Sequence, residues 1–234
     1  MDRDRGLTLS RRGVLAGAPF LPMAALATPH AAEPPISPIL AQARLDAGNA
    51  RFVAGQSSHP NLDARRRAAL AGAQHPFAVI LACADSRVAP ELIFDQGLGD
   101  LFVVRVAGNV VDEAVLASVE YAVIHLGCAL AMVLGHERCG AVQATVEALA
   151  GHGSPQDRET RIGALAKLIA PAVRAVPASS PNRVDAAVRL NAANAAVALA
   201  TTSPPLMARI AAGRLKVVAA RYDLDNGRVT PVRI

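Results

Sequence analysis

Four continuous runs of apolar residues constrain the fold of this chain most strongly. They are Phe77 to Ala82, Leu101 to Val106, Ala129 to Gly135 and Leu215 to Leu224. Short runs that are mainly apolar at successive positions, rather than at alternate ones, are typical of parallel strands buried on both faces. A fifth segment, Arg228 to Val232, follows an Asn-Gly turn, so we expect it to add an edge strand.

Helical segments precede and separate these runs. Two helices are expected before the first strand, at Ile39 to Gly55 and Leu62 to Ala73, and a third at Glu113 to Leu126. A longer helical region, Ala141 to Ala212, is interrupted by Gly, Ser and Pro at 151–155, 177–181 and 203–205. Strands joined by helices predict an α/β fold: a central, mostly parallel sheet of four strands plus an edge strand, flanked by helices, with N-terminal helical arms.

Composition supports one folded domain, which we place at residues 33–234. The chain is 52% apolar and 18% charged, which excludes a disordered protein, and with 3% aromatic residues the core is expected to be aliphatic. The formal net charge is +5. That charge is small, and the one basic run, at residues 65–67, would spread over three faces of a helix, so we expect no nucleic-acid partner.

The first 32 residues resemble an export signal and a linker. A polar segment ends in Ser10-Arg11-Arg12, and an apolar run from Val14 to Ala27 follows, which is the order of a twin-arginine signal. That run holds two prolines and is shorter than the about 20 residues of a membrane span, so no membrane anchor is expected after processing. We expect cleavage near Ala27 or Ala32 and a periplasmic or otherwise exported protein; the alternative is a tail that is not removed.

The end of the first strand and the end of the third carry residues that bind metals. Cys83 follows the first strand, and the third runs into His136 and Cys139. If these strands are neighbours in the sheet, the three side chains meet at a switch point, where open α/β sheets bind ligands. Two thiolates and one imidazole select zinc, and three protein ligands are typical of catalytic zinc, which leaves a fourth position for water or Asp85.

The pattern C-x-D-S-R followed by G-H-x-x-C-G resembles the zinc signature of the β-class carbonic anhydrases, and the likeness covers most of the chain after the signal. It implies one Zn²⁺ per subunit, bound by the Cys and His residues named above. It further implies a catalytic dyad in which Arg87 holds Asp85 away from the metal while Asp85 orients the zinc-bound water. In this family zinc-bound hydroxide attacks CO₂, giving bicarbonate and a proton.

The resemblance also implies a substrate pocket. Gln74 matches a glutamine that hydrogen-bonds bicarbonate, and Phe102, Tyr121 and the backbone of Gly140 match pocket walls that a dimer partner partly supplies. His125 matches a proposed proton relay, and a simple histidine at the end of a helix is an equal alternative. By the same resemblance we expect a homodimer or a dimer of dimers.

Two departures from the family bear on regulation. Some relatives close the site by letting the Asp bind zinc, in a state stabilised by bicarbonate in a pocket with Trp, Arg and Tyr. Arg105 matches that Arg, but Ile80 stands where the Trp would be, so we expect the open form, with Asp85 as fourth ligand only in a closed form. Val106 also replaces a polar residue that is common after the second strand.

Other interpretations of the same residues stay open. The nucleophile could hydrolyse a related heterocumulene, COS or CS₂, or the chain could bind zinc without turnover. A structural zinc site and redox-active thiols are weaker alternatives. We expect Cys128 to be a small buried hydrophobe and His30, His59, His75 and His152 to lie on the surface.

Overall fold

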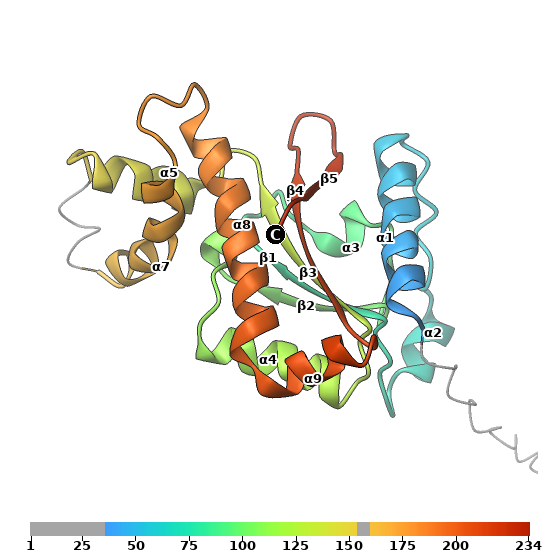
Figure 1. Ribbon diagram of the computed structural model, residues 1–234. Coiled ribbons are helices and arrows are strands. Elements are labelled where there is room, and N and C mark those ends of the chain that lie inside the picture. The colour runs from blue at the N-terminus through green and yellow to red at the C-terminus, as the bar shows by residue number, and fades with distance from the viewer. Residues whose placement is uncertain (1–35, 154–159) are drawn as a thin grey trace, which may run out of the picture. The chain divides into compact units, whose positions relative to one another are not determined.

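The computed structural model describes residues 36–153 and 160–234 (Figure 1). The strands are β1 (Ala78–Ala82), β2 (Leu101–Arg105), β3 (Leu130–His136), β4 (Lys216–Tyr222) and β5 (Val229–Val232). The helices are α1 (Pro38–Val53), α2 (Ala64–Ala69), α3 (Pro90–Ile93), α4 (Glu113–Ile124), α5 (Gly140–Leu149), α7 (Ile162–Ala175), α8 (Arg183–Thr202) and α9 (Pro204–Ala211), with a 3₁₀ turn, η1, at Ala107–Asn109.

The five strands form one sheet in the order β2-β1-β3-β4-β5. The first four are parallel, and β5 pairs antiparallel with β4 at the edge. The predicted α/β fold is therefore confirmed. Strands β1 and β3 are neighbours, with Ala82 opposite Leu134, while the chain runs from β1 to β2 on the other side. The carboxyl ends of β1 and β3 thus flank the switch point.

Helices cover both faces of the sheet (Figure 1), which explains why β1 and β3 are buried and apolar along their whole length. The edge strand β2 was also expected to be buried, but it is only partly buried and ends in the exposed Arg105. Side chains of β1 alternate between the faces. Val79 and Leu81 pack in a cluster with residues of α4, α8 and α9. Ile80 packs on the other face, in a cluster with Ala41 and Leu45 of α1 and with Ile93 of α3.

A third apolar cluster lies beside the switch point. It joins Cys83 and Cys139 to Val142 of α5, to Ile169 and Val173 of α7, and to Ala187 and Val188 of α8. The cysteines that end the strand segments are therefore packed into an apolar wall that three helices build. Such a wall keeps their sulfur atoms away from bulk water.

The second predicted helix is wrong in extent. Residues 62–73 were expected to be helical, whereas α2 covers Ala64–Ala69. Asp63 caps its N-terminus by accepting from the amide of Arg66, and no residue of α2 is buried, so no packing extends the helix. The short helix α3 and the turn η1 were not predicted.

The proposed signal at residues 1–32 and His30 lie outside the described residues. Within 36–153 and 160–234, no helix is long and apolar enough to cross a membrane.

Candidate metal centre

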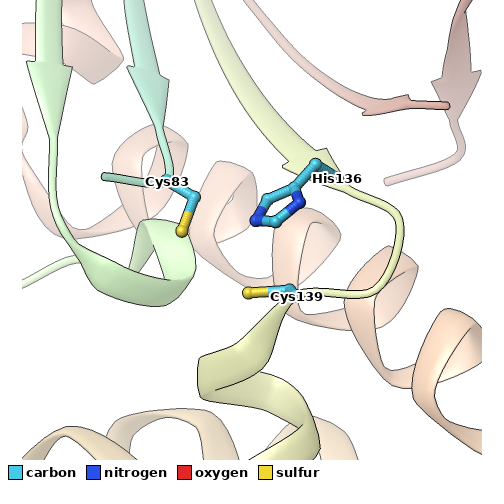
Figure 2. Close-up of side chains that lie close together, drawn as sticks. All are labelled: Cys83, His136 and Cys139. Atoms are coloured by element: carbon cyan, nitrogen blue, oxygen red, sulfur yellow. The ribbon is translucent and has the colours of Figure 1, made fainter. Parts of the chain in front are cut away.

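Three side chains from separate elements converge at the switch point (Figure 2). Cys83 follows β1, His136 is the last residue of β3, and Cys139 is the N-cap of α5. Their sulfur and ring nitrogen atoms all lie within 4.8 Å of one another. Cys83 is 5% exposed, and His136 and Cys139 are 0% exposed. The predicted ligands are thus brought together in a buried site.

The hydrogen bonds of His136 leave one ring nitrogen free for a metal. Nδ1 lies 2.9 Å from the carbonyl oxygen of Glu137, and because a carbonyl only accepts, Nδ1 carries the proton and donates it. Nε2 is buried and has no hydrogen-bond partner in the part of the chain that the structure describes. A buried imidazole with a free lone pair is costly unless something binds it, so this ring fits a metal ligand.

The mutual hydrogen bond of Cys83 and Cys139 shifts the pKa values of the two thiols in opposite directions. A hydrogen bond from the Cys139 thiol lowers the pKa of Cys83 far below its usual value against the opposing effect of burial, and the Gly108 amide lowers it further. The same bond to Cys83, together with burial, raises the pKa of Cys139. A dication at the site would favour ionisation of both thiols, and the sulfur and nitrogen donors match zinc rather than magnesium or calcium.

Asp85 and Arg87 form an ion pair beside the three ligands. Arg87 donates from Nε and Nη2 to the two carboxylate oxygens at 2.9 and 2.7 Å, and its amide donates to Asp85 Oδ1 at 3.0 Å. These hydrogen bonds hold the pKa of the Asp85 carboxyl well below its usual range. Its Oδ2 lies 3.9 Å from Nε2 of His136. An ionised carboxylate therefore stands at the edge of the metal centre.

Backbone and guanidinium donors fix the segment that carries Cys83 and Asp85. Arg105 donates from Nε to the carbonyl of Cys83 at 3.1 Å and from Nη2 to that of Asp85 at 2.6 Å. The amide of Gly108 donates to Cys83 Sγ at 3.3 Å. Sequence reasoning did not assign these contacts. A glycine just after a strand is a signal of close backbone approach that could have indicated Gly108.

A buried arginine forms ion pairs that hold the loop between His136 and Cys139 in place. Arg221 is 7% exposed and forms ion pairs with Asp185, Asp223 and Glu137 at 2.7, 2.7 and 3.3 Å. Glu137 supplies the carbonyl that holds the His136 ring. Sequence reasoning missed this residue as well, although a charge inside the apolar run of β4 was a signal that a buried ion-pair network exists.

The expected pocket residues occupy two places. Gly140 begins α5 directly after Cys139. Gln74 is exposed ahead of β1, and Phe102 lies near the amino end of β2, whereas the candidate ligands lie at or just beyond the carboxyl ends of β1 and β3. The rings of Phe102 and Tyr121 are 6.2 Å apart, and those of Tyr121 and His125 are 5.2 Å apart, so these three form one aromatic row.

The remaining histidines and the third cysteine behave as predicted where the structure describes them. His59, His75 and His152 are exposed. Cys128 is 1% exposed, and burial raises the pKa of its thiol to about 12, so it acts as a small apolar side chain.

The family model for carbonic anhydrase matches residues 78–229, a range that includes Cys83, His136 and Cys139. The chain belongs to the carbonic anhydrase family. Carbonic anhydrase 2 of Mycobacterium tuberculosis is 44% identical over 195 residues, covering 83% of this chain and 93% of that protein. A carbonic anhydrase of Mycolicibacterium smegmatis is 43% identical over 196 residues, covering 84% and 94%.

A solved structure places this carbonic anhydrase in the β class. One of two tetrameric β-carbonic anhydrases from Sordaria macrospora matches with a TM-score of 0.63 and 25% identity, covering 82% of this chain and 96% of that one. The predicted family is therefore confirmed.

Proposed function

We propose that this carbonic anhydrase catalyses the reversible hydration of CO₂ to bicarbonate and a proton, with one Zn²⁺ per subunit held by Cys83, His136 and Cys139. One observation carries the proposal: a buried imidazole nitrogen that has no hydrogen-bond partner among the described residues faces two thiols, and an ionised carboxylate stands 3.9 Å from that nitrogen. This combination suits activation of a water molecule. Relatives that carry the carbonic anhydrase name support it.

Three residues of the chain itself would orient the reacting water or hold the groups that do so. When bound, zinc acts as a Lewis acid that makes water a nucleophile near neutral pH. Asp85 offers a carboxylate oxygen to accept a hydrogen bond from a reacting water, which fixes the direction of attack. Arg87 keeps that carboxylate ionised and turned to its own guanidinium. Arg105 holds the backbone that carries Cys83 and Asp85.

The ion pair supports the open form of the site. Both carboxylate oxygens of Asp85 are bonded to Arg87, so Asp85 is not a fourth ligand in this arrangement. Arg105, the match to the regulatory bicarbonate pocket, is bonded to backbone carbonyls, and Ile80 is 0% exposed in β1. These contacts favour a site that CO₂ enters without a regulatory switch.

Stopped-flow CO₂ hydration between about pH 6.5 and 9, with zinc content measured on the same sample, tests the proposal. We expect turnover that rises with pH in proportion to the zinc present. Full zinc without turnover of CO₂ at any pH would contradict it. Assays with COS and CS₂ on that sample would then test the alternative substrate class.

We further propose that a second copy completes the pocket. The strand β1 separates Gln74 from Cys83, and a five-residue strand is about 16 Å long, so Gln74 does not reach the metal centre of its own subunit. Gln74, Phe102 and Tyr121 would then serve the partner's site, opposite Gly140. The tetrameric Sordaria relatives support an oligomer.

Mixed oligomers test whether Gln74 acts across subunits. Gln74→Ala and Asp85→Asn each lower activity in separate preparations. If Gln74 serves the partner, a dimer with one copy of each variant has one intact site and recovers about half of the wild-type turnover per dimer. Absence of recovery would place Gln74 in its own subunit's site.

The role of His125 is a separate proposal. This exposed ring follows Tyr121 by one helical turn and would carry protons to buffer. His125→Ala should lower kcat in dilute buffer and leave it unchanged in concentrated imidazole buffer. A loss that imidazole does not restore would contradict a relay.

Export is proposed from the sequence alone. The order of Arg11-Arg12, a short apolar run and small residues supports a twin-arginine signal, and a folded, zinc-loaded chain is the cargo that this route carries. Replacing both arginines by lysine should retain the protein in the cytoplasm. Normal appearance of that variant in the periplasmic fraction would contradict the proposal.

A further inference from the structure

The turn η1 beside Cys83 has an unusual backbone. Gly108 and Asn109 both have positive φ, at 70° and 43°, and both are buried. Glycine adopts this left-handed conformation freely, and asparagine accepts it more readily than most residues, so both residue types suit the turn. The turn also has a support from outside its own segment.

The support comes from Asn191 on α8. Its Nδ2 donates to the carbonyl oxygen of Gly108 at 2.8 Å, across 83 residues of sequence, and Asn191 is 4% exposed. On the other side, the amide of Gly108 donates to Cys83 Sγ at 3.3 Å. A Cβ atom at Gly108 would lie 2.7 Å from Cδ1 of Ile169, so a glycine is needed for this fit.

Packing alone does not explain why residue 191 of α8 carries a side-chain amide. Most buried positions of α8 are alanines, among them Ala192, Ala195 and Ala196, and the others besides Asn191 are the apolar Val188 and Leu199. A buried amide costs about 1–3 kcal/mol when its hydrogen bonds are not made, so an alanine would suffice if the position only filled space. The Asn191 donor is directed at the residue whose amide bonds the Cys83 sulfur.

We propose that Asn191 is a positioning residue that holds the Gly108 amide against the Cys83 sulfur and thereby weakens the donation of this thiolate to its metal. The inference rests on the proposed zinc site. An N–H donor draws electron density from a thiolate, and partners of this kind tune a metal through its ligands. Without Asn191 the turn relaxes, the amide leaves the sulfur, and Cys83 becomes the stronger donor.

Cobalt-substituted protein gives a readout that does not depend on CO₂ turnover. Co²⁺ replaces Zn²⁺ in the wild type, and the sulfur-to-cobalt charge-transfer band is recorded. Asn191→Ala removes the amide, and Asn191→Leu removes it while keeping most of the volume. Asn194→Ala is the matched control, because Asn194 is an exposed asparagine on the same helix.

We expect the charge-transfer band of both Asn191 variants to move to lower energy, with full cobalt loading, and that of Asn194→Ala to stay in place. A band that is unchanged in both Asn191 variants would overturn the inference. A band that moves only in Asn191→Ala would also overturn it, because that result would indicate the effect of a cavity rather than of a lost hydrogen-bond donor. A wild-type protein with no thiolate band would instead contradict the proposed metal site itself.

Discussion

Arg87 donates hydrogen bonds to both carboxylate oxygens of Asp85, at 2.9 and 2.7 Å, while Asp85 Oδ2 stays 3.9 Å from Nε2 of His136. The guanidinium and a metal ion bound at the proposed site would therefore compete for one carboxylate. In this arrangement the guanidinium holds it.

Arg87→Ala should release Asp85 toward the metal centre and lower CO₂ hydration at neutral pH by about tenfold or more. Turnover measured against pH is expected to change in shape as well as in height, because the carboxylate is now in competition with water. Arg51→Ala is the control, since Arg51 is also a partly exposed arginine, 38% against 51% for Arg87, and pairs with Asp95 rather than with Asp85. If Arg87→Ala kept the wild-type pH profile, the ion pair would have no part in the mechanism.

Cys139→Ser should lose zinc, whereas Cys128→Ser should keep it. Cys139 contributes its sulfur to the buried group of three, while Cys128 packs elsewhere with its sulfur 3.3 Å from the carbonyl of Pro76. A serine hydroxyl is a poor substitute for a thiolate ligand. Zinc per chain after dialysis against a weak chelator measures the difference. Stoichiometric zinc in the Cys139 variant would show that the ligand assignment is wrong.

The strands of the fold could be predicted because their sequences follow a simple pattern of apolar residues. The runs that became β1 and β3 are apolar at nearly every position because helices bury both of their faces. Once those strands are neighbours, Cys83, His136 and Cys139 must meet, because parallel strands bring their carboxyl ends to one edge. The convergence of these three side chains could therefore be predicted from strand ends and spacing.

The residues that contact the segments carrying the candidate ligands could not be predicted in this way. Asn191 bonds Gly108 across 83 residues, and Arg105 bonds Asp85 across 20. These hydrogen-bond partners depend on how the helices dock on the sheet. A periodic pattern in the sequence does not predict that docking. The extent of α2 was overestimated for a related reason, since helix propensity without a buried face does not fix where a helix ends.

Gly48→Ala should destabilise the fold by about 2 kcal/mol or more. Gly48 is buried where α1 crosses the end of α3, and an added Cβ atom would overlap the carbonyl oxygen of Phe94, which as backbone cannot rotate away. Urea unfolding of the zinc-loaded protein measures the loss. Gly72→Ala is the control, because nothing lies within 4 Å of its added Cβ, and it should change stability by less than about 0.5 kcal/mol. Equal stability of the two variants would mean that α1 does not dock on α3 in this way.

Asp185→Asn should destabilise the protein by about 2 kcal/mol at pH 7, because Asp185 accepts from both the buried Arg221 and Arg189, at 2.7 and 2.8 Å. Burial would raise the pKa of Asp185, but the hydrogen bonds from these two arginines outweigh it and lower the pKa. A carboxyl with a lowered pKa in the folded state adds stability above its unfolded pKa, near 4, and that stability is lost as the pH falls through the folded value.

The stability difference between wild type and Asp185→Asn is therefore expected to be full at pH 7 and to shrink as the pH falls below about 4. Urea unfolding at a series of pH values measures it. Asp46→Asn serves as the control, since Asp46 is an exposed aspartate on α1 that accepts only from Gln42 among the described residues, and it should match the wild type throughout. A gap between Asp185→Asn and the wild type that stayed constant down to acid pH would show that the charge of Asp185 did not cause the change. Arg221 would then hold the Glu137 loop without this carboxylate.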